Sequence, residues 1–264
     1  MVDMAAGKRR LRYGIRVVGT NKALGQHWLK NRAILEEIAD LCGRGELCVE
    51  IGPGLGFLTS SLLRRFEKVI AVEYDERLAM NLPKSFPGTN LEVVNGDILE
   101  YDFVGMPKGY VVAGNIPYYI TSPIIEKVLI AEKLPERVVL LMQKEVAERI
   151  VSEKETVLSL FVKNRAKVMA GLVVPASEFT PPPKVNSQVV VFEPFESGAV
   201  VGDEVFDLIR RGFASPRKKL IHNLAGYGPR EKLVETLKKV GVSPNARPGD
   251  VHLAEWGKLY KELI

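Results

Sequence analysis

A glycine-rich turn between a strand and a helix constrains the fold of this chain more than any other sequence feature. The run Glu50-Ile-Gly-Pro-Gly-Leu-Gly56 follows the apolar stretch 47–51 and precedes the helical pattern FLTSSLLRR. Glycines at such a turn let the backbone pass close to a ligand at a helix N-terminus. The run therefore predicts a βαβ unit and a ligand site at the carboxyl edge of a parallel sheet.

Strand and helix patterns alternate from residue 31 to residue 194. Strands are expected at 47–51, 69–73, 91–94, 110–113 and 137–142. Helices are expected at 31–42, 57–65, 121–131, 144–150 and 157–165. Two more strands, 167–174 and 187–192, flank the turn FTPPPKVN with no helix between them. The pattern predicts an α/β fold with a mainly parallel sheet and an antiparallel edge hairpin.

After Pro194 the sequence changes to short amphipathic segments separated by Pro and Gly. Four helices are expected, at 204–214, 216–226, 229–241 and 251–264, with Pro216 and Pro229 in first helical turns. The expected organisation is a basic N-terminal segment, an α/β domain and a small all-helical domain, at residues 1–30, 31–194 and 195–264.

The charge is unevenly distributed along the chain. The net charge is +5, but residues 1–32 carry eight basic residues against Asp3 alone, residues 195–264 carry +3, and the middle carries −5. Basic ends around an acidic centre predict a polyanion bound at the periphery, with a basic tail that has no partner as the alternative. The residues expected to contact the phosphates of such a polyanion are Arg9, Arg10, Arg12, Arg16, Arg217, Lys218 and Lys219.

Several classes of protein are disfavoured by composition. No apolar run approaches the roughly 20 residues of a membrane helix, and the N-terminus lacks the apolar core of a secretory signal. Cys42 and Cys48 cannot build a disulfide framework, and with three scattered His residues they form no metal-ligand pattern. We therefore expect a cytoplasmic protein, a monomer, with no metal and no membrane partner.

Two acidic residues follow predicted strands where a nucleoside would lie. Glu73 stands 21 residues after Gly52, the position at which a carboxylate accepts hydrogen bonds from ribose hydroxyls. Asp97 follows the next strand and is placed for an adenine amino group; the alternative for both is a solvated loop charge. Phe57 occupies the position of the third glycine in the dinucleotide fingerprint, which favours a smaller nucleoside cofactor over a pyrophosphate ligand.

The run Gly114-Asn-Ile-Pro-Tyr-Tyr119 after the 110–113 strand suits chemistry on an exocyclic amine. The lone pair of such a nitrogen is delocalised into the ring, so the nitrogen is a poor nucleophile. The side-chain oxygen of Asn115 and the carbonyl of Ile116 are placed to accept its two hydrogens and favour a tetrahedral geometry. Pro117 fixes the turn, and Tyr118 offers a face on which a base stacks. A turn with a buried tyrosine is the alternative.

The order and spacing of these motifs resemble a known family. NKALGQHWL from Asn21, the GPGLG turn, VEYD, NGD, NIPYYITSPII and FTPPPKVNSQVV are similar to those of the small-subunit ribosomal RNA adenine dimethyltransferases, the KsgA group. The resemblance covers residues 21 to about 225. It implies a Rossmann-like S-adenosylmethionine-dependent methyltransferase domain, followed by a small helical domain. It also implies dimethylation of two adjacent adenosines near the 3′ end of the RNA during ribosome biogenesis.

The resemblance also implies residue roles. The implied cofactor-binding residues are His27, Leu29, Gly52, Gly54, Glu73, Asp97 and Asn115. Asn115 would lie between cofactor and target, and Phe179 would stack on the target base opposite Tyr118. Many bacterial members carry Asn where this chain has His27, and Trp28 replaces the usual Phe and is expected to pack.

Three other functions share part of this pattern. A large-subunit adenine methyltransferase of the antibiotic-resistance (Erm) type shares the Asn-x-Pro-Tyr chemistry, although FTPPPKVNSQVV and ASPRKKLIHNL favour the small-subunit enzyme. A non-catalytic RNA-binding assembly factor would not need an intact Asn115–Tyr118 motif. A nicotinamide dehydrogenase shares the glycine turn and the acidic residue after it.

Overall fold

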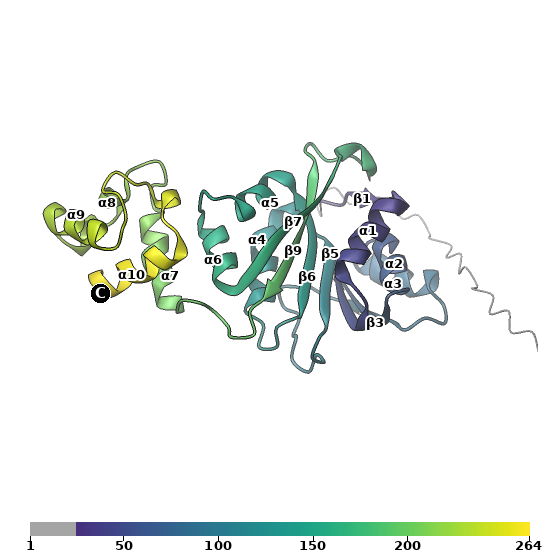
Figure 1. Ribbon diagram of the computed structural model, residues 1–264. Helices are drawn as coiled ribbons and strands as arrows, with labels where there is room; N and C mark the ends of the chain where they lie inside the picture. The colour runs from purple at the N-terminus through teal and green to yellow at the C-terminus, as the bar shows by residue number, and fades with distance from the viewer. Residues whose placement is uncertain (1–24) are drawn as a thin grey trace, which may run out of the picture.

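A seven-stranded sheet forms the centre of the molecule in the computed structural model, which describes residues 25–264 (Figure 1). The strand order is β4-β3-β2-β5-β6-β9-β7. The parallel strands are β2 (Gly45–Ile51), β3 (Phe66–Glu73), β4 (Leu91–Asn95), β5 (Val111–Asn115) and β6 (Arg137–Gln143). β9 (Ser187–Pro194) pairs antiparallel with both β6 and β7 (Ala166–Val174). The predicted fold class, including the antiparallel edge hairpin, is confirmed.

Helices cover both faces of this sheet (Figure 1). They are α1 (Arg32–Cys42), α2 (Phe57–Leu62), α3 (Glu76–Ser85), α4 (Thr121–Leu129), α5 (Lys144–Val151) and α6 (Val157–Arg165). Alternate strand residues point to opposite faces. Val112 accordingly packs in the core that α4, α5 and α6 share, whereas Val111 and Ala113 pack in the core of α1 and α2. The central strands β5 and β6 read as continuous apolar runs because both of their faces are buried, whereas the edge strands β4 and β7 are partly exposed.

Two elements were not expected from the sequence. α3 carries few apolar residues, chiefly Leu78, Ala79 and Leu82, and it contains Pro83, a residue that disfavours the interior of a helix. A two-stranded antiparallel ladder joins β1 (Trp28–Leu29) to β8 (Phe179–Thr180). Strands of two residues are too short to show a period of two. This ladder nevertheless matters, because it ties the segment before α1 to the proline-rich turn.

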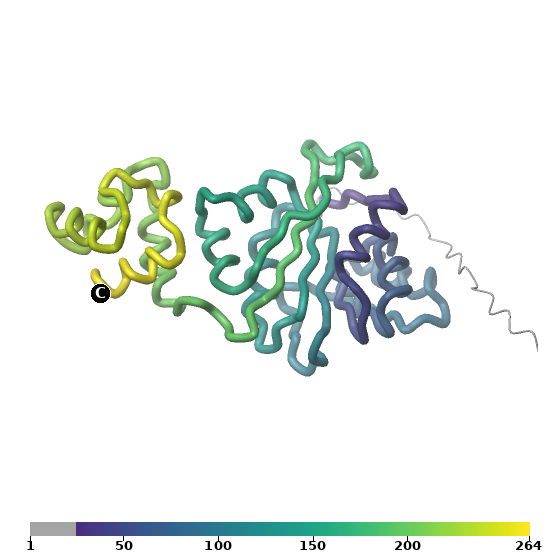
Figure 2. The backbone as a smooth tube through the Cα atoms, viewed as in Figure 1, coloured from purple at the N-terminus to yellow at the C-terminus, as the bar shows by residue number. Residues whose placement is uncertain are grey.

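The C-terminal helices pack around a core of their own. They are α7 (Asp203–Gly212), α8 (Leu220–Asn223), α9 (Arg230–Lys239) and α10 (Leu253–Leu263), and the fully buried Trp256 lies among them. Figure 2 shows an extended connection between β9 and α7, so the proposed boundary at residue 195 falls where the sheet ends. α8 is shorter than expected, and Pro216 lies in the turn before it rather than in its first helical turn.

Polar contacts fasten the C-terminal helices to α6. The buried Glu155 accepts hydrogen bonds from Lys163 Nζ at 2.9 Å and Ser159 Oγ at 2.7 Å, and its backbone N–H donates to the Gly249 carbonyl at 2.8 Å. The Asn164 side chain bonds both the N–H and the carbonyl of Val201, at 2.8 and 3.0 Å.

Within residues 25–264 there is no helix long and apolar enough to cross a membrane.

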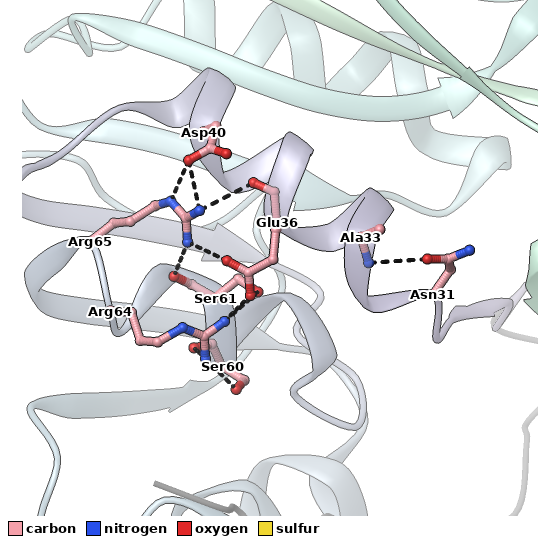
Figure 3. Close-up of polar contacts among 8 residues, drawn as sticks. All are labelled: Asn31, Ala33, Glu36, Asp40, Ser60, Ser61, Arg64 and Arg65. Carbon is pink, nitrogen blue, oxygen red and sulfur yellow. Dashed lines mark hydrogen bonds and ion pairs between the residues drawn. The ribbon is translucent and has the colours of Figure 1, made fainter. Parts of the chain in front are cut away.

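A charged network locks α1 against the end of α2 (Figure 3). Arg65 bonds Glu36 at 2.9 Å and Asp40 at 2.7 Å, and Arg64 also pairs with Glu36. Burial opposes ionisation of Glu36, but hydrogen bonds from Arg65 and Ser61 outweigh it and hold the pKa of that carboxyl below its ordinary value. Because α2 follows the glycine turn, this network fixes the helix whose N-terminus faces the ligand site.

Gly56 provides a test of how tightly the glycine turn is packed. It is the N-cap of α2 with a φ of 83°, and an added Cβ would lie 2.6 Å from the Phe86 ring and 2.7 Å from Leu82. Gly56→Ala should therefore lower the free energy of unfolding by about 2–4 kcal/mol, through overpacking and backbone strain together.

Gly88→Ala is the matched control for that substitution. Gly88 has a φ of 71° but nothing within 4 Å of an added Cβ, so only backbone strain of about 1 kcal/mol is expected. Urea unfolding midpoints at constant m-value measure both variants. Equal losses of stability in the two variants would contradict the packing argument.

Candidate functional site

The register of the parallel strands brings three polar strand ends to one edge of the sheet. Ile51 is paired with Val72 on one side and Gly114 on the other. The residues that follow, Gly52, Glu73 and Asn115, therefore emerge together. A cavity of about 320 Å³ opens at this edge, a volume within the range of small-molecule sites. Its lining includes ten residues that the sequence singled out: His27, Leu29, Gly52, Gly54, Glu73, Asp97, Asn115, Ile116, Pro117 and Tyr118.

The glycine turn is held against the Glu73 carboxylate. Gly54 has a φ of 57°, and its N–H donates to Glu73 Oε2 at 3.0 Å, while the Asp75 N–H donates to Oε1 at 2.8 Å. Burial raises the pKa of Glu73 although these N–H groups favour its ionised form. Two carboxylate oxygens have about four acceptor positions, so each oxygen retains capacity for a ligand hydroxyl.

Glu50 is a member of the site for which the sequence suggested no role. It is 1% exposed at the end of β2 and lines the cavity, and its Oε2 has no hydrogen-bond partner within the described residues. Burial raises the pKa of Glu50 to about 8. The available signal was an acidic residue inside the apolar strand LCVEI. Burying a carboxylate costs stability, so a carboxylate retained inside a strand is a candidate for a functional role.

Asp97 also lines the cavity, one strand beyond Glu73. Glu73 pairs with Asn95 in the β3–β4 ladder, so Asp97 follows two residues beyond that pair. The Leu99 N–H donates to Asp97 Oδ1 at 2.9 Å, which orients the carboxylate. With Glu50 and Glu73 it makes three carboxylates around a cavity whose described lining contains neither Lys nor Arg. This charge disfavours an anionic pyrophosphate ligand and favours a cationic one.

Asn115 is held by a hydrogen bond to the segment that precedes α1. Its Nδ2 donates to the backbone carbonyl of His27 at 3.0 Å. An amide that donates through nitrogen on one side turns its oxygen to the other, so Oδ1 is the atom available to accept. The neighbouring Ile116 is fixed by its N–H, which donates to the Leu141 carbonyl at 3.2 Å.

Tyr118 begins a short 3₁₀ turn after Pro117. Its hydroxyl lies 2.6 Å from Oγ of the buried Ser187. Burial raises the pKa of Tyr118, so its hydroxyl is neutral at physiological pH. The ring lines the cavity at its outer side, next to the 62% exposed Tyr119.

The β1–β8 ladder closes one side of the cavity. Leu29 pairs with Phe179 and Trp28 with Thr180, and the His27 Nδ1–H donates to the Pro181 carbonyl at 2.7 Å. Trp28 packs against Leu55 and Leu78, as expected for a packing residue.

Phe179 is not placed as the sequence predicted. Its side chain is 2% exposed and belongs to the core that α1 and α2 cover, and it is absent from the cavity lining. The physical reason is the pairing with Leu29, which directs the ring into that core. In this structure the Phe179 side chain is therefore buried, and it pairs with Leu29, one of the residues that line the cavity.

Three of the residues predicted to contact phosphates are described by the structure, and none of the three lines the cavity. Arg217, Lys218 and Lys219 are exposed in the turn before α8, where Lys219 Nζ donates to Asn245 Oδ1 at 2.7 Å. Arg9, Arg10, Arg12 and Arg16 lie outside the described residues.

Within residues 25–264 no group of three or more His, Cys, Asp and Glu side chains is placed to hold a metal ion.

Comparisons with known proteins agree on one class of enzyme. Residues 18–264 match the family described as "Ribosomal RNA adenine dimethylase". The "Ribosomal RNA small subunit methyltransferase A" of a Nostoc species is 37% identical, over 92% of this chain and 97% of that protein. The protein of the same name from Geobacter sulfurreducens is 36% identical, over 94% and 96%.

Two solved structures resemble the whole molecule. A dimethyladenosine transferase from Plasmodium falciparum aligns with a TM-score of 0.77 and 31% identity, over 89% of this chain and 97% of that one. The 23S rRNA methyltransferase ErmE aligns with a TM-score of 0.73 and 26% identity, over 89% and 99%.

Glu50 predicts a pH dependence of stability. The pKa of Glu50 is about 8 in the folded state and 4.5 ordinarily. The protonated carboxyl therefore makes its full contribution to the free energy of unfolding below about pH 4.5, and this contribution is lost as the pH rises through 8. Glu50→Gln cannot ionise, so it should not lose this stability. Between pH 5 and 9 the free energy of unfolding of the wild type should fall by about 2–5 kcal/mol relative to that of Glu50→Gln. Denaturant unfolding across that range is the measurement, and parallel pH profiles for the two proteins would refute the assignment.

Proposed function

This chain belongs to the ribosomal RNA adenine dimethylase family, and from this membership we propose how its own residues carry out the reaction. The protein is an S-adenosylmethionine-dependent methyltransferase that dimethylates adenosine in small-subunit ribosomal RNA, as the motifs predicted. The finer expectations belong to the proposal: two adjacent adenosines near the 3′ end as acceptors, and action during ribosome biogenesis, in the cytoplasm, as a monomer.

One observation carries the proposal. The Asn115–Tyr118 run projects from the end of β5 into the same cavity that Glu50, Glu73 and Asp97 line. Such a cavity suits a ligand with two cationic groups and an adenosine, and it places that ligand beside acceptors for an amine. A non-catalytic assembly factor would need neither feature.

The inner part of the cavity fits the methyl donor. S-adenosylmethionine supplies an electrophilic methyl group on a sulfonium centre. We assign Glu73 to the ribose hydroxyls, because its carboxylate retains acceptor positions beyond those used by Gly54 and Asp75. Asp97 takes the adenine amino group. The turn at Gly52 and Gly54 approaches the methionine part, and the segment from His27 to Leu29 forms the opposite wall.

The outer part of the cavity holds the acceptor amine. The donated bond to His27 directs Asn115 Oδ1 toward one hydrogen of the amine, and the Ile116 carbonyl accepts the other. In the first of the two transfers, holding both hydrogens out of the plane of the base withdraws the nitrogen lone pair from the ring and aims it at the donor. The methylated nitrogen then loses its acidic proton to water, and in the second transfer one hydrogen remains to be held. The catalytic contribution is positioning, since the described lining offers no strong base.

The target base must leave its stack to enter this cavity, as other base-modifying enzymes require. Tyr118 offers it a face, and Pro117 sets the direction of the turn. The exposed cluster Arg217–Lys219 binds phosphates outside the cavity, together with the basic residues near the N-terminus. Phosphate contacts hold the RNA in register, while the cavity selects the base.

Transfer of labelled methyl groups tests the function. Purified small subunits should be methylated by the protein and S-adenosylmethionine, whereas protein-free large-subunit RNA should not. The opposite preference would support the large-subunit alternative, to which the likeness to ErmE points. Failure to label either acceptor would contradict the proposal.

Glu73→Ala should weaken S-adenosylmethionine binding at least tenfold, because each charge-assisted hydrogen bond contributes about 1.5–3 kcal/mol. Affinity for RNA should stay close to that of the wild type. Calorimetric titration with the cofactor measures the first effect, and Glu73→Gln, which keeps one acceptor oxygen, should be intermediate. Unchanged cofactor affinity in the alanine variant would remove Glu73 from the site.

Asn115→Ala should reduce kcat about 10²- to 10³-fold, the usual effect of removing one preorganised polar group from an active site. The interaction strengthens as the amine nitrogen becomes tetrahedral, so kcat should fall more than KM rises. Single-turnover methyl transfer to saturating small subunits is the assay. A rate near that of the wild type would contradict the proposed mechanism.

Neutralising Arg217, Lys218 and Lys219 together should weaken RNA binding and flatten its dependence on salt. Removal of one cation that binds a phosphate lowers the slope of log K against log salt by about 0.7–0.9. The control neutralises Lys84, Lys108 and Lys133, which are exposed elsewhere on the α/β part. Equal salt slopes for the two triple variants would show that the cluster is only a solvated turn.

A further inference from the structure

His27 contacts three parts of the acceptor side at once. Its backbone carbonyl accepts the Asn115 amide at 3.0 Å, and its Nδ1–H donates to the Pro181 carbonyl at 2.7 Å. Its ring stacks on Tyr118 with 5.9 Å between ring centroids and 19° between planes. A carbonyl can only accept, so the bond to Pro181 also fixes the tautomer, with the proton on Nδ1.

These contacts divide between backbone and side chain. Any residue at position 27 supplies the carbonyl that orients Asn115. The stack on Tyr118 needs an aromatic ring at this position, and the bond to Pro181 needs the N–H of the imidazole. The side chain therefore has a function separable from that of the backbone, and this function concerns Tyr118.

The plane of the Tyr118 ring is not fixed by its own hydroxyl. That hydroxyl is anchored on Ser187 Oγ at 2.6 Å, but its oxygen lies on the axis that runs from Cβ through the ring. Rotation about this axis turns the face of the ring without moving the oxygen. A contact on the ring face must therefore set the plane, and the imidazole, itself held by Pro181, is such a contact.

We propose that the imidazole of His27 is a positioning residue for the target adenine, because it fixes the plane of Tyr118 on which that base stacks. The base then uses the face of Tyr118 that the imidazole leaves uncovered. This inference rests on the proposed function and extends it. It assigns the side chain of His27 to docking of the RNA, in addition to its place in the wall of the cofactor cavity.

Two substitutions separate the ring from its hydrogen bond. His27→Asn retains an N–H near the position of Nδ1 but removes the ring face, whereas His27→Phe retains a ring and removes the hydrogen bond. A stacked aromatic pair corresponds to about a threefold to tenfold change in an equilibrium. At saturating S-adenosylmethionine, His27→Asn should raise the half-saturating concentration of small subunits by that factor, and His27→Phe should stay within about twofold of the wild type.

Because His27 also lines the cofactor cavity, each variant is assayed at a concentration of S-adenosylmethionine that saturates it, as established by calorimetric titration of that variant. In a Tyr118→Leu background the His27→Asn penalty on half-saturation should disappear, because the imidazole acts through that ring. A merely structural role would give the same penalty in both backgrounds.

Three outcomes would overturn the inference. They are an unchanged half-saturation in His27→Asn, a penalty that persists in the Tyr118→Leu background, and a penalty in His27→Phe as large as that in His27→Asn. Each presupposes that the wild type methylates small subunits. An inactive wild type would overturn the proposed function and this inference with it, whereas an active wild type with any of the three results overturns the inference alone.

Discussion

The hydrogen bond from the Asn115 amide to the His27 carbonyl is the contact on which the rest of the site depends. It joins the end of β5 to a segment 88 residues earlier in the chain, and in doing so it sets which atom of the amide remains available to accept a hydrogen bond. The β1–β8 ladder and the packing of Trp28 on Leu55 hold that segment in place. A substitution that disturbs the β1–β8 ladder is therefore expected to change the orientation of the Asn115 amide, although Asn115 itself is unaltered.

The acidic residues that line the cavity are separate from the basic cluster Arg217–Lys219. Three carboxylates surround the cavity, and burial raises the pKa of both Glu50 and Glu73, so the site costs stability that a cationic ligand offsets. The basic cluster Arg217–Lys219 lies in the C-terminal helices instead. In the proposed function a polyanionic backbone is thus held away from the acidic cavity, and only a neutral base enters it. This arrangement favours an extruded nucleotide over a duplex.

Most of the sheet and the inner site could be predicted because they rest on local patterns. Glu73 and Asn115 follow apolar strands, and parallel strands end at a common edge, so their convergence follows from the topology. Features that depend on long-range contacts were missed. The ladder that buries Phe179 pairs it with Leu29, far away in the sequence, and nothing local distinguishes a buried phenylalanine from one that stacks on a base. The protonation preference of Glu50 likewise depends on a burial that only the folded structure gives.

The orientation of the Asn115 amide is tested most directly by Asn115→Asp. Aspartate keeps the acceptor oxygens but cannot donate to the His27 carbonyl, so the account predicts that the group turns away from its productive position. Nucleosides released from small-subunit RNA after reaction with excess enzyme, analysed by mass spectrometry, report the product. The wild type should yield N6,N6-dimethyladenosine, and Asn115→Asp should yield almost none under conditions where S-adenosylmethionine saturates it. Dimethyladenosine formed by Asn115→Asp at the rate of the wild type would contradict the account.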